Sequence, residues 1–369
     1  MGGSVRDLLL GIAPKDFDIS TSAKPEDVKK IFRNCWLIGR RFRLAHVHFG
    51  KQIIEVSTFR KGDTESCELI TQDNEWGTPD EDVLRRDFTI NGLFYDAKNN
   101  LIIDYVGGYE DIHKKTLKTI GIAEARFYQD PVRMLRLIKF QARIGFAIDD
   151  EALHALFKCK LEIIKSSHAR LLEEVLRMLE SRSATTFFLL MSEYGLLEYL
   201  FPAVNTFLKS SHKDKLLSLL HEADEVQQEM KLGRSTLMSL LAWPLLNEAL
   251  KEKFPKGSPA PHLGSILQEV TSVMNTLCAD FMHLPKKMRA FMRFILVTQL
   301  RLTPLTKRKL MRGKTAHDEA FPRALELCML RGAFDPQARA AYNEWKDKVP
   351  EQPTITREKR GRLRSRRRR

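Results

Sequence analysis

The sequence predicts an α/β head followed by a long all-α region, in an elongated chain with more than one domain. Within the first hundred or so residues, the alternating β-branched segment 52–59 and the apolar segment 101–105 are typical of strands, and helical segments lie among them. From about residue 123 the apolar residues recur at helical spacing. The length of 369 residues suits two or three domains.

Composition excludes several classes of protein. A hydrophobic share of 43% with 29% charged residues excludes wholesale disorder. Five scattered cysteines without a Cys-x-x-Cys pair exclude a disulfide framework and a cysteine-built zinc site. The apolar runs are shorter than the roughly 20 residues that cross a bilayer. Because charges arrive early, at Arg6 and Asp7, we expect no signal peptide and a cytoplasmic protein.

The positive charge of the chain is concentrated at its end. The formal net charge is +14, and residues 357–369 hold nine basic residues and one acidic residue. The rest of the chain is therefore only mildly basic. An arginine-rich segment with almost no apolar residues is expected to be disordered and to bind RNA phosphates without sequence preference. Such ends also serve solubility or membrane association, and composition alone leaves these alternatives open.

The opening of the chain combines glycines with a helical segment. Gly2 and Gly3 allow the backbone to approach an anion closely, and a helix that begins just after them points free N–H groups at a phosphate. A glycine turn before an ordinary surface helix explains the same pattern equally well. A helix is also expected over residues 25–32, after the turn at residues 22–24.

Three acids are candidates for a metal site. On a strand over residues 15–19, Asp16 and Asp18 would project to one side, roughly 7 Å apart at Cα, with Phe17 and Ile19 facing the core. Paired carboxylates suit Mg²⁺, although a solvated strand face would look the same. Glu55 lies within the apolar strand 52–59, where an acid is costly unless it is paired, metal-bound or turned toward water.

Two arginine-rich segments are candidates for phosphate and base binding. Arg85 and Arg86 could clamp triphosphate oxygens, and Asp87 could hold an arginine or support the metal site. A charged helix end is the simpler alternative.

The second of these segments begins a predicted helix over residues 131–146. Asp130 is expected at its N-cap, with Arg133 and Arg136 on one face, and capping alone could account for Asp130. Further helices are expected over residues 169–179 and 185–201.

Taken in order, these segments resemble the bacterial poly(A) polymerases and transfer-RNA CCA-adding nucleotidyltransferases, the class II branch of the polymerase-β-like superfamily. The resemblance covers about residues 2–200. It implies a chain of four parts: a nucleotidyltransferase (polymerase-β-like) head at 1–121, a helical neck for base and RNA binding at 122–205, a helical RNA-binding body at 206–348 and a disordered arginine-rich tail at 349–369.

The resemblance also implies a reaction. AMP is transferred from ATP to an RNA 3′ hydroxyl, and pyrophosphate leaves. Asp16, Asp18 and Asp87 are the implied catalytic acids, and we expect Asp87 to be a supporting residue. The residues implied to hold two Mg²⁺ ions are Asp16, Asp18 and Glu55. The implied triphosphate contacts are Gly3, Arg6 and Arg85, the implied readers of the base are Asp130 and Arg133, and Arg136 is implied to lie nearby on phosphate.

Within this family the sequence favours polyadenylation. Residues 37–47 resemble the segment typical of bacterial poly(A) polymerases, whereas CCA-adding enzymes usually carry a Gly-x-x-His-Gly-Thr type sequence there. The arginine-rich tail agrees. A phosphohydrolase domain is not expected, because His317-Asp318 is the only His-Asp pair. The expected partners are RNA 3′ ends, ATP and RNA-decay proteins. A CCA-adding enzyme and a catalytically weakened RNA-binding relative remain the alternatives.

One departure from the family pattern concerns the first residues. Family members normally carry an apolar strand that leads into the two glycines, and this sequence begins Met1-Gly2-Gly3. Either the start codon is misassigned, or the head lacks its first strand. A head without that strand could be weak or inactive, because the strand supports Asp16 and Asp18 in the family.

Overall fold

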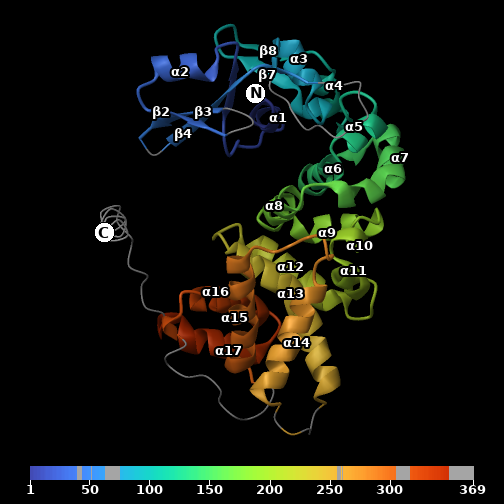
Figure 1. Cartoon of the computed structure of the whole chain (residues 1–369), viewed down its shortest axis with the longest axis vertical. Coiled ribbons are helices and arrows are strands. Elements are labelled where there is room, and N and C mark those ends of the chain that lie inside the picture. The colour runs from blue at the N-terminus through green and yellow to red at the C-terminus, as the bar shows by residue number, and fades with distance from the viewer. Residues whose placement is uncertain are drawn as a thin grey trace. The chain divides into compact units, whose positions relative to one another are not determined.

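The structure is a computed structural model that describes residues 1–39, 44–50, 52–62, 75–255, 259, 261–304 and 316–348. The polypeptide forms two compact units; Figure 1 colours the chain by residue number from the N- to the C-terminus. The first comprises Met1–Asp214 and Thr276–His283, and the second comprises Lys215–Asn275 and Leu284–Arg369. The predicted head (1–121) and neck (122–205) thus belong to one unit. That unit also includes Thr276–His283, a later segment that the sequence did not place there. The predicted tail and residues 40–43 lie outside the described residues.

The head contains a four-stranded sheet in the order β1-β4-β3-β2. Strand β1 runs parallel to β4, and the other neighbours are antiparallel. The bounds are β1 Asp18–Thr21, β2 Cys35–Ile38, β3 Leu44–Phe49 and β4 Gln52–Thr58. Helix α2 (Pro25–Ile31) covers one face, where Val28 joins a core that contains Ala45, Val47 and Val56. Because side chains alternate along a strand, Glu55 lies on the opposite face from Val56.

The predicted strand around the acid pair is shifted. Strand β1 begins at Asp18, so Asp16 lies in the preceding loop rather than on the strand. Phe17 and Ile19 are 58% and 46% exposed, so the expectation that they face the core is wrong. Phe17 lies in the loop before β1. Ile19 lies on the terminal strand of the described sheet, so a neighbouring strand covers it on one side only.

The rest of the head packs around two short hairpins and several helices. Helix α3 begins with a capping box formed by Thr78 and Glu81. Strands β7 and β8 form an antiparallel pair, which confirms the strand predicted at residues 101–105. These elements are α1 Gly3–Leu9, β5 Arg60–Lys61, β6 Glu75–Trp76, α3 Pro79–Leu84, η1 Thr89–Asn91, β7 Leu93–Asp96, β8 Leu101–Asp104, α4 Gly108–His113 and β9 Thr116–Leu117.

A helical segment follows the head within the same unit. The predicted helix at 131–146 is present as α6, with Leu135 and Ile138 in the core. One predicted helix, residues 185–201, is instead two helices that part at Gly195, whose φ is +73°. The elements are α5 Ala123–Gln129, α6 Val132–Ile144, β10 Ala147–Ile148, α7 Asp150–Cys159, η2 Lys160–Lys165, α8 His168–Leu179, α9 Ala184–Glu193, α10 Leu197–Leu200 and α11 Pro202–Leu208.

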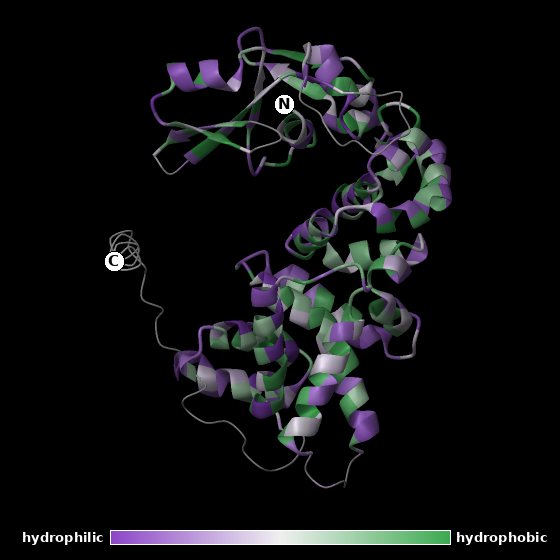
Figure 2. Ribbon diagram, viewed as in Figure 1, coloured by the Kyte–Doolittle hydropathy of each residue, from purple (hydrophilic) through white to green (hydrophobic). Residues whose placement is uncertain are grey.

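In the described residues of the second unit, the regular secondary structure consists of helices. Its helices carry hydrophobic and hydrophilic stretches side by side, as Figure 2 shows, which is the pattern of amphipathic helices around a core. Phe321, Leu325 and Cys328 form part of that core. The elements are α12 Lys213–Val226, which starts in the first unit, α13 Arg234–Lys253, α14 Leu263–Thr276, α15 Lys286–Leu302, α16 Phe321–Gly332, α17 Pro336–Trp345 and η4 Lys346–Lys348. In the described part of the chain, none of the helices combines the length and apolarity needed to span a membrane.

Candidate active site

Two acids stand next to each other on the face of the head sheet that lies opposite α2. Asp18 on β1 is in register with Glu55 on β4, and Glu55 is in register with His46 on β3. Neighbouring strands lie about 4.8 Å apart, so this carboxylate row (Asp18, Glu55 and His46) forms a line across three strands. His46 Nε2 is 3.4 Å from Glu55 Oε2. Asp18 is exposed and the Glu55 side chain is 43% exposed, so both carboxylates are open to a ligand.

The donor chemistry of this row fits a hard divalent cation. Mg²⁺ takes oxygen ligands, usually one or two protein carboxylates together with phosphate oxygens and water. Asp18 and Glu55 supply such carboxylates from neighbouring strands, and Asp16 lies two residues before Asp18. No ready-made group of three potential metal-ligating side chains occurs among the described residues. The three-acid metal site therefore stays a prediction.

The glycine opening forms a turn and a short helix, as expected. Gly2 has a φ of +62° and α1 begins at Gly3. Arg6, however, is only 3% exposed: its Nε donates to Asp7 Oδ1 at 2.9 Å and its Nη1 to Asn91 Oδ1 at 2.5 Å. Its guanidinium also lies 4.9 Å from the centre of the Phe140 ring. Burial lowers the pKa of Arg6, despite the nearby Asp7 carboxylate. In this arrangement the Arg6 guanidinium is not accessible for the predicted contact with a triphosphate.

The paired arginines after α3 are both held by one buried acid. Asp82 Oδ1 accepts from Arg85 Nη2 at 2.5 Å, and Asp82 Oδ2 accepts from Arg86 Nη2 at 2.6 Å. Burial alone would raise the pKa of Asp82, but the two guanidinium groups outweigh it and hold the pKa below its usual value. If Arg85 binds a triphosphate, its guanidinium must release the Asp82 carboxylate and bind a phosphate oxygen instead.

Asp87 is the centre of a second ion-pair group. Its Oδ1 accepts from Arg133 Nε at 3.0 Å, and its Oδ2 lies 2.8 Å from Arg136 Nη1. Burial would raise the pKa of Asp87, but Arg136 and Arg133 outweigh burial and the pKa lies below its ordinary value. Both oxygens are thus engaged by arginines of α6. The supporting role that we expected for Asp87 stays a prediction.

Asp130 extends the same group to another helix. Its Oδ2 accepts from Arg136 Nη2 at 2.8 Å and from Arg170 Nη2 at 2.6 Å. We call Asp87, Arg133, Arg136, Asp130 and Arg170 the arginine network. Helix α6 begins at Val132 without a side-chain cap, so the capping interpretation of Asp130 is wrong. Asp130 Oδ1 is buried and has no hydrogen-bond partner among the described residues, which leaves one acceptor for a ligand.

Three residues near these groups were missed by sequence reasoning. His46 and Arg170 have no local signal, because their contacts depend on strand register and helix packing. Arg126 is 1% exposed, and its Nη2 donates to the Arg86 carbonyl at 2.7 Å. Burial lowers its pKa to about 10. The signal for Arg126 was available: it adjoins the apolar residue Phe127 on the buried side of α5.

Comparison with known protein families gives two matches. A family model described as the poly A polymerase head domain matches residues 1–118. Another, described as a probable RNA and SrmB-binding site of polymerase A, matches residues 145–208. The first match contains the carboxylate row, and the second contains Arg170. The two matches therefore fall on the head and on the helical segment that follows it.

Individual relatives extend these matches along the chain. The sequence is 34% identical over 355 residues to poly(A) polymerase I of Escherichia coli O6:H1, covering 92% of this chain and 75% of the relative. It is 37% identical over 202 residues to the CCA-adding enzyme of Geobacillus stearothermophilus, covering 54% of this chain and 50% of the relative. A solved structure, the Bacillus stearothermophilus CCA-adding enzyme in complex with CTP, superposes with a TM-score of 0.65 at 26% identity, covering 94% of this chain and 77% of that chain.

Proposed function

This chain belongs to the family of bacterial poly(A) polymerases and their CCA-adding relatives, and from that premise we propose that it adds adenosines to RNA 3′ ends without a template. The reaction transfers AMP from ATP to the RNA 3′ hydroxyl and releases pyrophosphate. A polynucleotide adenylyltransferase of this kind would act in the cytoplasm, where RNA and ATP are both present.

One observation carries the choice of adenosine tailing over CCA addition. The sequence match to poly(A) polymerase I continues through the helical second unit, whereas the match to the CCA-adding enzyme covers about half of the chain. The head and the helices after it are shared by both classes. The second unit is therefore the part whose sequence supports a poly(A) polymerase.

We assign the chemistry to the carboxylate row. Asp18 and Glu55, with Asp16 from the preceding loop, would hold Mg²⁺, which when bound lowers the pKa of the RNA hydroxyl and neutralises charge on the triphosphate. The 3′ oxygen attacks the α-phosphorus, the bond to the β-phosphate oxygen breaks, and pyrophosphate leaves. The acids stand on two neighbouring strands of one sheet, and this placement supports their holding the reacting groups together.

We assign recognition of the base to the arginine network. The free Oδ1 of Asp130 can accept a hydrogen bond from the exocyclic amino group of adenine, and Arg133 can donate to a ring nitrogen. Two contacts of Arg133 are long, at 3.3 Å to the Arg126 and Arg85 carbonyls, and are the ones most easily exchanged for a base. Guanine and uracil present a carbonyl at the equivalent position and would be rejected by Asp130, whereas cytosine carries an amino group there and would be accepted like adenine.

The remaining predicted contacts concern the phosphates. Gly3 at the start of α1 can offer a backbone N–H to the triphosphate. Arg6, Arg85 and Arg136 each hold a carboxylate in the structure. We propose that they contact phosphate only by exchanging that carboxylate, and that otherwise they fix the acids in place.

An incorporation assay tests the proposed function. The purified chain is incubated with Mg²⁺, a short RNA that has no transfer-RNA character, and each nucleoside triphosphate separately. ATP alone should give a long ladder of products, and GTP and UTP should give little extension. Absence of any extension with ATP would contradict the proposal.

CCA addition is the second candidate, favoured by the superposition on the CCA-adding enzyme. A transfer RNA that lacks its CCA end distinguishes the two. An enzyme of that class adds three nucleotides from CTP and ATP and stops, and it leaves the unrelated RNA unextended.

A further inference from the structure

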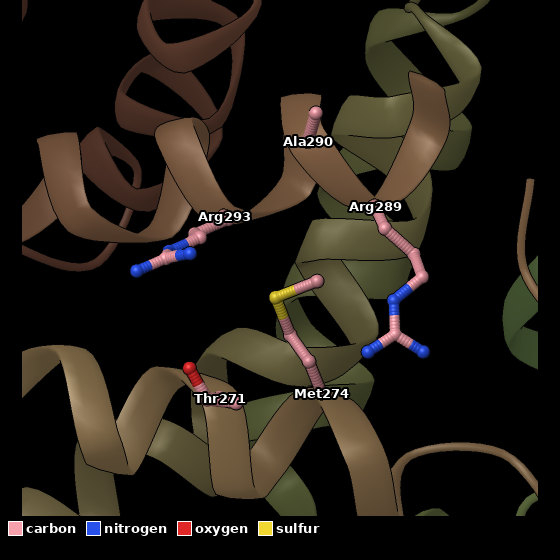
Figure 3. A pocket seen from close by; sticks show the side chains of 5 residues that line it. All are labelled: Thr271, Met274, Arg289, Ala290 and Arg293. Atoms are coloured by element: carbon pink, nitrogen blue, oxygen red, sulfur yellow. The ribbon is translucent and has the colours of Figure 1, made fainter. Parts of the chain in front are cut away.

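A small cavity lies between two helices of the second unit, α14 and α15. Its volume is about 190 Å³, and it is lined by Thr271, Met274, Arg289, Ala290 and Arg293. Figure 3 shows Arg289 and Arg293 on opposite sides of Met274, with Arg293 on the side of Thr271. We call it the α14–α15 pocket. Neither the carboxylate row nor the arginine network contributes a residue to it.

The helix that forms one wall carries an unusual charge. Between residues 286 and 302 the sequence has five basic residues and no acid. Three of the basic residues, Lys286, Lys287 and Arg289, fall in the first turn of α15. Positive side chains there oppose the helix dipole, which favours anions at an N-terminus. The arrangement costs stability unless an anion binds, and it makes this surface strongly positive.

The two guanidinium groups of the pocket have donors to spare. Arg289 Nη2 donates to Asn275 Oδ1 at 2.8 Å, a neutral partner that leaves the charge uncompensated. Among the described residues, the Arg293 side chain has no hydrogen bond or ion pair. Both side chains are exposed. Glu269, the only acid of α14, is paired with Lys253.

Size and lining decide the class of ligand. Pockets that enclose a whole small molecule measure about 300–1,000 Å³, so this one is too small to enclose a free nucleotide. It has room for one phosphate group beside either guanidinium, with the attached sugar against the apolar Met274 side chain that lies between them. Arginine donors match phosphate oxygens in a bidentate geometry. A phosphate within an extended chain meets these requirements.

We propose that the α14–α15 pocket holds one backbone phosphate of the RNA substrate, outside the unit that carries the chemistry. This inference rests on the proposed function for the identity of the polyanion. Such an anchor strengthens the binding of RNA without altering the reacting groups. Its loss therefore raises the KM for RNA and leaves kcat unchanged.

Binding of a labelled RNA with a blocked 3′ end tests the inference, because it needs no incorporation. Arg289→Gln, Arg293→Gln and Arg293→Lys are compared with Arg301→Gln, which removes the same charge from the same helix but does not line the pocket. Each pocket Gln variant should weaken binding about 3- to 10-fold, and the slope of log K against log salt should fall by about 0.7, the value for one phosphate of a single strand. Arg293→Lys should keep the salt slope and recover part of the affinity.

Thermal unfolding and kcat at saturating RNA are measured for the same proteins. The value of kcat should not change, and no pocket variant should lose stability; Arg289→Gln should gain slightly, because it removes a positive charge from the first turn of α15. Pocket variants that bind RNA as tightly as Arg301→Gln would overturn the inference. It is also overturned if ATP competes with RNA at the wild-type pocket but not in Arg293→Gln, since the pocket would then take a free nucleotide. Normal RNA binding with no tailing by the wild-type chain would instead contradict the proposed function and leave this inference standing.

Discussion

The carboxylate row and the arginine network hold acids in opposite ways. Asp18 and Glu55 are open to solvent, with His46 the nearest basic side chain to Glu55. Asp87 and Asp130 lie in the arginine network, and each is contacted by two arginines. One group thus leaves its carboxylate oxygens available, and the other uses them to fix arginines that belong to different elements.

This difference in exposure predicts which acids act in the reaction and which stabilise the fold. An exposed acid can be removed with little effect on folding, so its role shows in activity. An acid that is largely withdrawn from solvent and has two arginine partners cannot be removed without leaving positive charges unpaired, so its role shows first in stability. The two groups should therefore respond to the same substitution, acid to amide, in different assays.

The largest expected effect is the loss of activity in Asp18→Asn. Removing a charged group that acts on the transition state costs at least about 10²- to 10³-fold in kcat. Because Asp18 is exposed, the free energy of unfolding should change by no more than about 0.5 kcal/mol. Single-turnover incorporation and urea unfolding measure the two quantities. Asp27→Asn, a half-exposed acid on α2, is the control and should retain activity; wild-type activity in Asp18→Asn would break the comparison.

Asp87→Asn should give the converse result. It leaves Arg133 and Arg136 without their shared carboxylate, and breaking a buried pair in this way typically costs about 3–5 kcal/mol of stability. Urea unfolding should show the loss directly. The comparison fails if this variant is as stable as the wild type while its activity disappears.

The pH dependence sharpens the same point. The pKa of Asp87 lies below the value of about 3.9 expected in an unfolded chain, so its contribution to stability is present above that pH. It is lost as pH falls through the folded pKa. The difference in unfolding free energy between wild type and Asp87→Asn should accordingly shrink as the pH is lowered below about 3.9. A difference that is constant or growing toward acid would contradict the assigned ion pairs.

A smaller effect is expected on base selection in Asp130→Asn. An amide in place of the carboxylate can turn its NH₂ toward the base, so discrimination of adenine against guanine should fall by roughly 10- to 100-fold, the range for one well-placed hydrogen bond to a charged group. Ratios of kcat/KM for ATP and GTP measure it. Unchanged ratios would remove Asp130 from base recognition and leave it a structural member of the network.

The smallest effect belongs to the exposed edge of the network. The Arg170 side chain is 53% exposed, and its pair with Asp130 should contribute at most about 1 kcal/mol. Arg170→Gln is therefore expected to lower the unfolding free energy by that amount or less and to do so less at high salt. If Arg170→Gln lowers the unfolding free energy as much as Asp87→Asn does, exposure does not predict how much each residue of the network contributes to stability.

Sequence reasoning predicted the parts of the fold whose signal is local. Strand β4 and helices α2, α6 and α8 follow from alternation or helical spacing within a dozen residues. The helix predicted over residues 185–201 failed at Gly195, where a left-handed residue interrupts a continuous apolar pattern. Phe17 and Ile19 were placed wrongly because alternation says which residues share a face but not whether anything covers it.

The candidate site was predicted in its residues more than in its contacts. The roles of the acids and arginines stay predictions; Asp87 and Arg133 are far apart in sequence, and their pairing depends on how α6 packs against the head. Register between β1 and β4 likewise decides that Asp18 lies beside Glu55. Pairings between residues so far apart in the chain produce no periodic pattern that could be recognised in a single sequence. The open acceptor of Asp130 could be recognised only once its partners were known.

Metal binding tests the separation of the two groups most directly. Mn²⁺, a paramagnetic substitute for Mg²⁺, is titrated with ATP into the wild type, Glu55→Gln and Asp87→Asn, and bound metal is measured by electron paramagnetic resonance at a temperature where all three are folded. Our account predicts that the wild type and Asp87→Asn bind the metal and that Glu55→Gln loses most of the binding. Retained binding in Glu55→Gln together with lost binding in Asp87→Asn would contradict it.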